Sequence, residues 1–147
     1  MNTPAGNDTT AVNLVYCGAQ PTPIHQIQGT GNRSPLVGET LTIEGVVVGD
    51  FQNGDGDRYG TNLGGYFVQE LDARTDDDPL TSEGIYVADS RTDVKLGDLV
   101  SVTGTVLETG FITQLGRPSD VTVCARNADL PSPAVIEFPL DSVDALE

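Results

Sequence analysis

The chain has 147 residues, which is enough for one domain with a hydrophobic core. Its 22 acidic residues outnumber 7 basic ones, and the formal charge of −15 argues against a protein that binds nucleic acid through charge alone. No apolar run approaches the ~20 residues of a membrane-spanning helix, so we expect no membrane partner. The acidity suits a secreted, saline or calcium-rich setting, and an acidic surface selected only for solubility explains it equally well.

The first part of the chain, residues 1–16, is polar and is expected to be a linker or a flexible N-terminal segment. Its opening letters, MNTPAGNDTT, lack the positive and apolar regions of a signal peptide, so any secretion signal is expected to lie outside this sequence. Ile24–Gln28 is expected to form a short element that leads into a flexible turn at Gly29–Ser34.

Two long strands are predicted at Thr40–Phe51 and Leu99–Glu108, which are rich in valine and other β-formers. Each has a glycine at a matching internal position, Gly45 in the first and Gly104 in the second. Because glycine inside a strand normally costs stability, this pattern predicts bulges or sharp coiling. Long strands that bend at glycine are typical of a small closed barrel.

Shorter strands are predicted at Tyr66–Leu71, Gly84–Ala88, Phe111–Leu115 and Val121–Ala125, with a turn at Arg117–Asp120. No helix of ordinary length is expected. The pattern predicts an all-β fold, a five-stranded OB-fold barrel with extended N- and C-terminal segments. The alternative is an immunoglobulin-like sandwich, which needs about seven strands and usually a buried tryptophan. This chain contains no tryptophan.

The two cysteines, Cys17 and Cys124, lie near opposite ends of the expected domain. They have neither a CxxC motif nor the histidine partners of a zinc site, so we predict a disulfide and hence an oxidising compartment. The alternative is a pair of buried free thiols that act as small hydrophobic residues.

Several motifs occur in a fixed order along the chain: IHQIQGTGNRSPLVGETLTIEGVV, LGGYFVQE, DDDPLTSEGIYV, LGDLVSVTGTV and TQL. Together they resemble the OB-fold domain of secreted bacterial nucleases, which precedes an endonuclease/exonuclease/phosphatase catalytic domain. The resemblance covers Cys17 to Val123. It implies an extracellular accessory domain at residues 17–126, followed by a proline-containing linker at residues 127–147 that leads to the downstream nuclease domain.

The chain itself is not expected to be an enzyme. His25 is the only histidine, and it lies among Ile24, Gln26 and Ile27, so we interpret it as structural. Neither a GxSxG nor an HExxH motif occurs. The expected function is assistance in handling nucleic-acid substrates for the parent enzyme, which is expected to be a metal-dependent nuclease.

OB barrels bind single-stranded DNA or RNA by aromatic stacking on their second and third strands and through neighbouring loops. The expected in-out alternation places Tyr66 and Val68 inside the barrel and Phe67 outside, although Glu70 then shares the inward parity. On the third strand Tyr86 is expected outside. The candidate nucleic-acid-binding residues are Phe67, Gln69, Tyr86, Arg58, Tyr59, Phe111 and Arg117. The alternative is that these side chains are structural or contact the downstream domain, in a module that positions it without binding nucleic acid.

The acidic loop between the second and third strands is a candidate calcium site. Asp72, Asp76 and Asp78 repel one another unless a cation or solvent neutralises them. In the related nucleases an acidic run often fills this loop, but here residues 73–75 interrupt it. A second acidic stretch, Asn53–Asp57, lacks the spacing of an EF-hand and is interpreted as a solvated turn. No cofactor is expected to be required, and calcium is the candidate ion.

Overall fold

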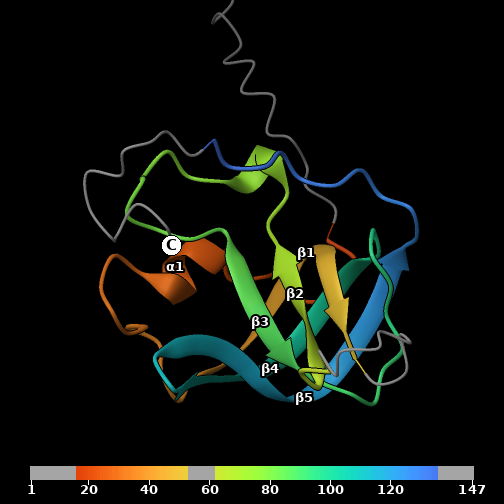
Figure 1. Cartoon of the computed structure of the whole chain (residues 1–147), viewed down its shortest axis with the longest axis horizontal. Coiled ribbons are helices and arrows are strands. Elements are labelled where there is room, and N and C mark those ends of the chain that lie inside the picture. Colours follow the sequence, from red (N-terminus) through yellow and green to blue (C-terminus); the bar gives the residue numbers. More distant parts are fainter. Residues whose placement is uncertain (1–15, 53–61, 136–147) are drawn as a thin grey trace, which may run out of the picture.

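The computed structural model describes residues 16–52 and 62–135. Five strands form a closed barrel in the order β1-β2-β3-β5-β4, with β3 and β5 parallel and every other neighbouring pair antiparallel (Figure 1). The elements are α1 Ile24–Gln28, β1 Thr40–Phe51, β2 Gly65–Gln69, the 3-10 turn η1 Asp72–Arg74, β3 Gly84–Ala88, β4 Leu99–Thr109 and β5 Ile112–Ala125. The predicted all-β class is therefore confirmed. Among the described residues, no helix is long and apolar enough to cross a membrane.

The last strand corrects the sequence-based interpretation. Two strands separated by a turn at Arg117–Asp120 were expected, but β5 runs without a break from Ile112 to Ala125. Its pairing with β4 jumps from Thr103↔Asp120 to Thr105↔Gly116, so three residues of β5 lie opposite one residue of β4. The Gly-Arg-Pro-Ser-Asp sequence is therefore a bulge-like irregularity within one strand and not a turn between two strands. Residues on both sides of it remain paired with β4.

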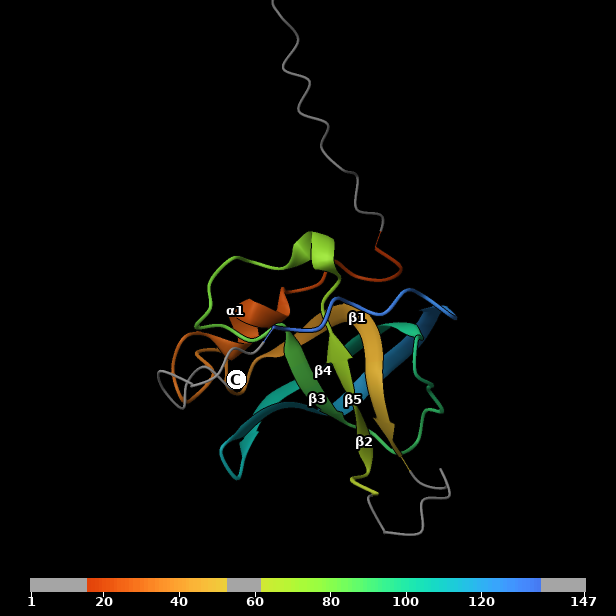
Figure 2. The same cartoon turned by 45° about the horizontal axis from the view of Figure 1, so that its top comes forward.

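The barrel encloses an apolar core that α1 completes at one end. In α1, Ile24 and Ile27 are 1% and 0% exposed and belong to the same core cluster as the strand residues. This helix lies next to the start of β3, while β2 and β3 run side by side down the front of the barrel (Figures 1 and 2). The fully or nearly fully buried strand members are Ile43, Val47, Tyr66, Val68, Ile85, Val87, Val100, Val102, Val106 and Leu115.

A disulfide joins Cys17, in the segment before α1, to Cys124 near the end of β5. It confirms the predicted pairing, and the alternative of two free thiols is wrong. The bond spans 107 residues of sequence. Closing so long a loop stabilises a fold by ~4–5 kcal/mol in the chain-entropy description, because it restricts the unfolded chain. A disulfide between the first and last segments of the domain fits an oxidising compartment.

Glycine is required at the two internal strand positions for two different reasons. The register of β4 against β5 shifts between Thr103 and Thr105, so Gly104 lies at the predicted bulge. Gly45 lies in a regular part of β1, but β2 passes very close to it: a Cβ there would lie 2.4 Å from the carbonyl oxygen of Gln69. The side chain is excluded by a neighbouring backbone, which cannot move aside as a flexible side chain does.

We predict that Gly45→Ala lowers the free energy of unfolding by about 2–3 kcal/mol, because the added methyl group forces β1 and β2 apart. Gly31→Ala is the matched control, since nothing lies within 4 Å of its Cβ position and that change stays within ~0.5 kcal/mol of the wild type. Urea denaturation of the two variants measures the difference. Equal stabilities would contradict the close approach of the two strands.

Candidate functional site

Alternation along β2 sends its side chains to two different surroundings. Tyr66 and Val68 are fully buried, while Phe67 between them is 37% exposed. Glu70, directly after the strand, continues the inward series and is 2% exposed. The outward orientation of Phe67 and the inward orientation of Tyr66 are thus confirmed. The same alternation required the charged side chain of Glu70 to point inward, and it does.

Three aromatic rings from β1, β2 and β3 meet on the outer face of the barrel. The ring centroids of Phe67 and Tyr86 are 5.2 Å apart with a tilt of 53°, and Phe51 meets Phe67 edge-on at 5.8 Å. Tyr86 covers Gly65, where a Cβ would lie 2.7 Å from its Cζ atom, and its hydroxyl donates a hydrogen bond to the Leu63 carbonyl at 2.6 Å. Burial raises the pKa of Tyr86. We call Phe51, Phe67 and Tyr86 the aromatic patch.

A groove of about 540 Å³ lies beside the aromatic patch. Cross-strand pairing connects the two, because Phe67 lies opposite Tyr86 and Tyr86 lies opposite Gln114, which lines the groove. Two arginines also line it. Arg91 donates to the Pro118 carbonyl at 3.0 Å and keeps 75% of its side chain exposed, and Arg117 is exposed on the irregularity of β5. The groove therefore presents two guanidinium groups beside the aromatic patch, and that of Arg91 lies 3.5 Å from the Asp89 carboxylate, which also lines the groove.

Phe111 lies at the tip of the hairpin that joins β4 to β5. Thr109 pairs with Ile112, so Gly110 and Phe111 form a two-residue loop, and both have positive φ, 60° and 72°. Glycine is the residue that tolerates this conformation, and a phenylalanine in it is strained. Its side chain is nevertheless 99% exposed, so burial does not compensate for the strain. It lines a smaller hollow of about 180 Å³ at the start of β5, whereas Arg117 lies near the middle of that strand.

The structure thus brings together some of the predicted binding residues and separates others. Phe67, Gln69 and Tyr86 lie on paired strands β2 and β3, and Arg117 lines the adjoining groove. Phe111 lines the smaller hollow and not that groove. The remaining two candidates, Arg58 and Tyr59, and the acidic stretch Asn53–Asp57 lie outside the described residues. Sequence reasoning missed Arg91, whose only signal was its position shortly after a predicted strand.

The predicted calcium ligands have separate partners. Both oxygens of Asp72 accept hydrogen bonds from Ser132, whose hydroxyl lies 2.7 Å from Oδ2, and these bonds hold the pKa of Asp72 below its usual value. Asp76 accepts from the Thr81 hydroxyl at 2.8 Å, which is the main reason that its pKa is lowered. Asp78 accepts from the Leu80 amide. Calcium binding by these three carboxylates stays a prediction and requires them to exchange these partners.

Arg74, in the segment that interrupts the acidic run, anchors this loop to the barrel. Its Nη2 atom donates to Glu44 at 2.9 Å, and the two side chains are only 9% and 2% exposed. Glu44 also accepts a hydrogen bond from the amide of Cys17, and the guanidinium of Arg74 lies 4.6 Å from the ring centre of Tyr16. The residues that interrupt the acidic run therefore attach the loop to the barrel. Removing either Arg74 or Glu44 would destabilise the protein, because the other charge would be left buried without a partner.

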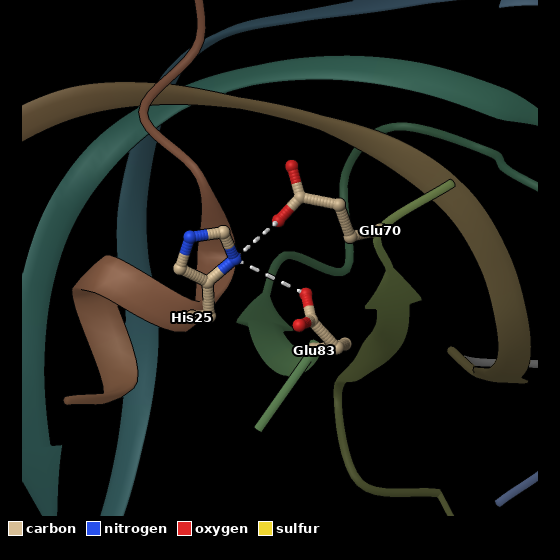
Figure 3. Close-up of side chains that lie close together, drawn as sticks. All are labelled: His25, Glu70 and Glu83. Carbon is tan, nitrogen blue, oxygen red and sulfur yellow. Dashed lines mark hydrogen bonds and ion pairs between the residues drawn. The ribbon is translucent and has the colours of Figure 1, made fainter. Parts of the chain in front are cut away.

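A second cluster of chemically active side chains lies where α1 meets the β2–β3 loop (Figure 3). The Nδ1 atom of His25 is 3.4 Å from Oε2 of Glu83 and 3.8 Å from Oε2 of Glu70. Its other ring nitrogen, Nε2, is 3.8 Å from Oδ2 of Asp76. One imidazole therefore lies among three carboxylates. We call His25, Glu70 and Glu83 the histidine cluster.

Glu70 is the most buried member of the histidine cluster. Its pKa is raised to about 7, chiefly by burial and also by the carboxylate of Glu83. The 2.6 Å hydrogen bond from the Ile24 amide, His25 and Arg74 act in the opposite direction. In the described part of the chain, the second oxygen of Glu70 accepts no hydrogen bond. The carboxylate is thus short of donors and of positive charge.

Comparison of the sequence with known protein families finds no matching family, and comparison with curated proteins finds no matching relative.

We predict that Glu70 makes the protein less stable as pH rises. Because its folded pKa of about 7 exceeds the ordinary value of 4.5, the folded state retains a proton that the unfolded state has lost. The free energy of unfolding, measured in chelator, should fall between pH 4.5 and 7 by up to about 3 kcal/mol more than in Glu70→Gln. Glu39→Gln, at an exposed position, should keep the wild-type slope. Parallel pH profiles for wild type and Glu70→Gln would contradict the assignment.

Proposed function

We propose that the barrel is an OB-fold module. The proposal is supported by five strands in a closed ring, by a long first strand that pairs with both β2 and β4, and by closure through β3 and β5. OB-folds use the face of their second and third strands for oligonucleotides or oligosaccharides. The aromatic patch lies on that face here. The helix α1 stands before β1 in this chain, so the end of the core that it covers is closed by an N-terminal element.

The proposed activity is binding of single-stranded nucleic acid along the outer face of β2, β3 and β5. The observation that carries it is the half-exposed Phe67–Tyr86 pair, which adjoins a groove with Arg91 and Arg117. Aromatic faces stack on bases of any sequence, and guanidinium groups neutralise phosphates.

The net charge of −15 makes this binding weak and sensitive to salt. The positive charge is distributed unevenly, however. Arg74 and Arg126 are paired with the buried carboxylates of Glu44 and Asp98. Arg117 is exposed and forms no ion pair with a described residue, so its charge is available at the groove. Acidic surroundings then limit binding to ligands that reach the groove itself.

We propose further that the module serves an extracellular nuclease as a non-catalytic accessory domain. The supports are the resemblance of the ordered motifs to OB-fold domains of secreted nucleases and the Cys17–Cys124 disulfide, which suits an oxidising compartment. The expected partner in the parent protein is the downstream nuclease domain, and the expected ligand is its DNA or RNA substrate.

A second candidate is a docking module that positions the catalytic domain without binding nucleic acid. It is favoured by the segment after β5, which Ser132 fixes to Asp72 through three hydrogen bonds. This segment passes next to η1 (Figures 1 and 2) and exposes Leu130 and Val135 by 52% and 88%. Exposed apolar side chains on an anchored segment suit contact with a further domain.

We predict that the chain binds a fluorescent single-stranded oligonucleotide at low salt, measured by anisotropy. Phe67→Ala should weaken binding about tenfold, since stacking contributes ~1–3 kcal/mol for each base. Arg117→Gln should weaken it and reduce the slope of log affinity against log salt by ~0.7, because one phosphate contact is lost. Lys95→Gln removes the same charge from an exposed site away from the groove and is the matched control.

The Phe111→Gly variant shows whether the strained Phe111 ring contributes to oligonucleotide binding, when its stability and its affinity in the same assay are compared with those of the wild type. Glycine relieves the positive φ of 72°, so the variant should be more stable by about 1 kcal/mol. If the exposed ring contacts the ligand, affinity falls at the same time. Absence of binding by the wild type at protein concentrations of about 10⁻⁴ M would contradict the nucleic-acid proposal and favour the docking module.

A further inference from the structure

We propose that the histidine cluster, His25, Glu70 and Glu83, binds one divalent first-row transition-metal ion of the zinc type. The ion would join α1 to the two ends of the β2–β3 loop, independently of any nucleic-acid ligand at the aromatic patch. The three ligand atoms come from segments far apart in the sequence and lie within 4.8 Å of one another.

The distances between the ligand atoms suit a metal of this size. Two ligands bound at about 2.1 Å to a tetrahedral ion are about 3.4 Å apart. The Nδ1 atom of His25 lies 3.4 Å from Oε2 of Glu83 and 3.8 Å from Oε2 of Glu70. All three ligand atoms lie within 4.8 Å of one another, so an ion can bind them once the two carboxylate oxygens draw closer together, and water fills the remaining position. The side chains of His25 and Glu83 are 15% and 18% exposed, so an ion reaches them from solvent.

The barrel orients the ligands before any ion is present. Glu83 accepts a hydrogen bond from the Asp76 amide through Oε1, which leaves Oε2 directed at the imidazole. The amide of Ile24, the first residue of α1, fixes Oε2 of Glu70 on the other side. Figure 3 shows both carboxylates converging on the same ring nitrogen. Ligands held in this way lose little conformational freedom when they bind.

The second ring nitrogen of His25 has the environment that a metal-bound histidine requires. Its Nε2 atom faces Oδ2 of Asp76 at 3.8 Å, while the other oxygen of Asp76 accepts a hydrogen bond from the Thr81 hydroxyl. A carboxylate on one side of an imidazole favours the N–H on that side and leaves the opposite nitrogen free to bind a metal. Asp76, which was predicted as a calcium ligand, is in this arrangement a positioning residue.

A cation also relieves the electrostatic cost of this site. The Glu70 carboxylate is 2% exposed and accepts one hydrogen bond, and the groups facing it are Glu83, His25 and Arg74. Arg74 is already committed to Glu44 at 2.9 Å. A divalent ion supplies two positive charges where the protein supplies at most a histidine and a shared arginine. The imidazole ligand favours zinc over calcium, which prefers oxygen alone.

The test is titration of the chelator-treated full chain with zinc chloride by calorimetry, together with its melting temperature and the visible spectrum of its cobalt(II) form. The wild type should bind one zinc ion per chain and show a saturable rise in melting temperature. Glu83→Gln and His25→Ala should each weaken zinc binding at least tenfold, and His25→Ala should change the cobalt d–d bands because a nitrogen ligand is lost. Millimolar calcium should not displace the zinc.

Asp77→Asn is the matched control, because it removes a carboxylate from an exposed position in the same loop. It should bind zinc like the wild type. Glu83→Gln should retain the oligonucleotide affinity of the wild type, so failure of either proposal can be told from failure of the other. The proposal is overturned if the wild type binds no zinc at concentrations up to about 1 mM, if Glu83→Gln and Asp77→Asn bind it equally, or if calcium displaces it.

Discussion

The alternation of side chains along β2 is the constraint on which both candidate sites depend. Pairing with β1 on one side and β3 on the other fixes its register, so Tyr66 and Val68 fill the barrel and Phe67 faces outward. A slip of one residue would expose the core side chains and bury the aromatic ring of Phe67 against the interior. The absence of a side chain at Gly45 lets β1 approach closely enough to maintain this register.

The same alternation has opposite electrostatic consequences at its two faces. On the outside it joins a half-exposed aromatic pair to a groove lined by Arg117, which forms no ion pair with a described residue, and by Arg91, which is paired with Asp89. On the inside it continues to Glu70 and places a carboxylate where water hardly reaches it. The barrel tolerates this charge because α1 brings an amide and His25 to it. The two faces of β2 therefore contribute to two different candidate sites.

Much of the architecture followed from local sequence patterns. β-Branched runs interrupted by glycine predicted β1 and β4, and cysteines at the two ends of the domain predicted the disulfide. The local sequence could not show that the turn-like stretch Arg117–Asp120 is an irregularity in a continuous strand. The strand continues there because β5 pairs with β4 on both sides of this stretch, and that pairing depends on residues far away in the sequence. The histidine cluster was hidden for a similar reason. His25, Glu70 and Glu83 belong to three segments, and only the closed barrel brings them together.

The central claim is that the outward face of β2 and β3, with the adjoining groove, is the surface that binds a single strand. Mapping of backbone amide shifts in ¹H–¹⁵N spectra during titration with a short single-stranded oligonucleotide tests it most directly. The account predicts shifts concentrated at Phe67, Tyr86, Gln114 and Arg117, with little change around His25. Shifts centred on α1 or on the segment after β5, or no shifts at saturating oligonucleotide, would contradict it.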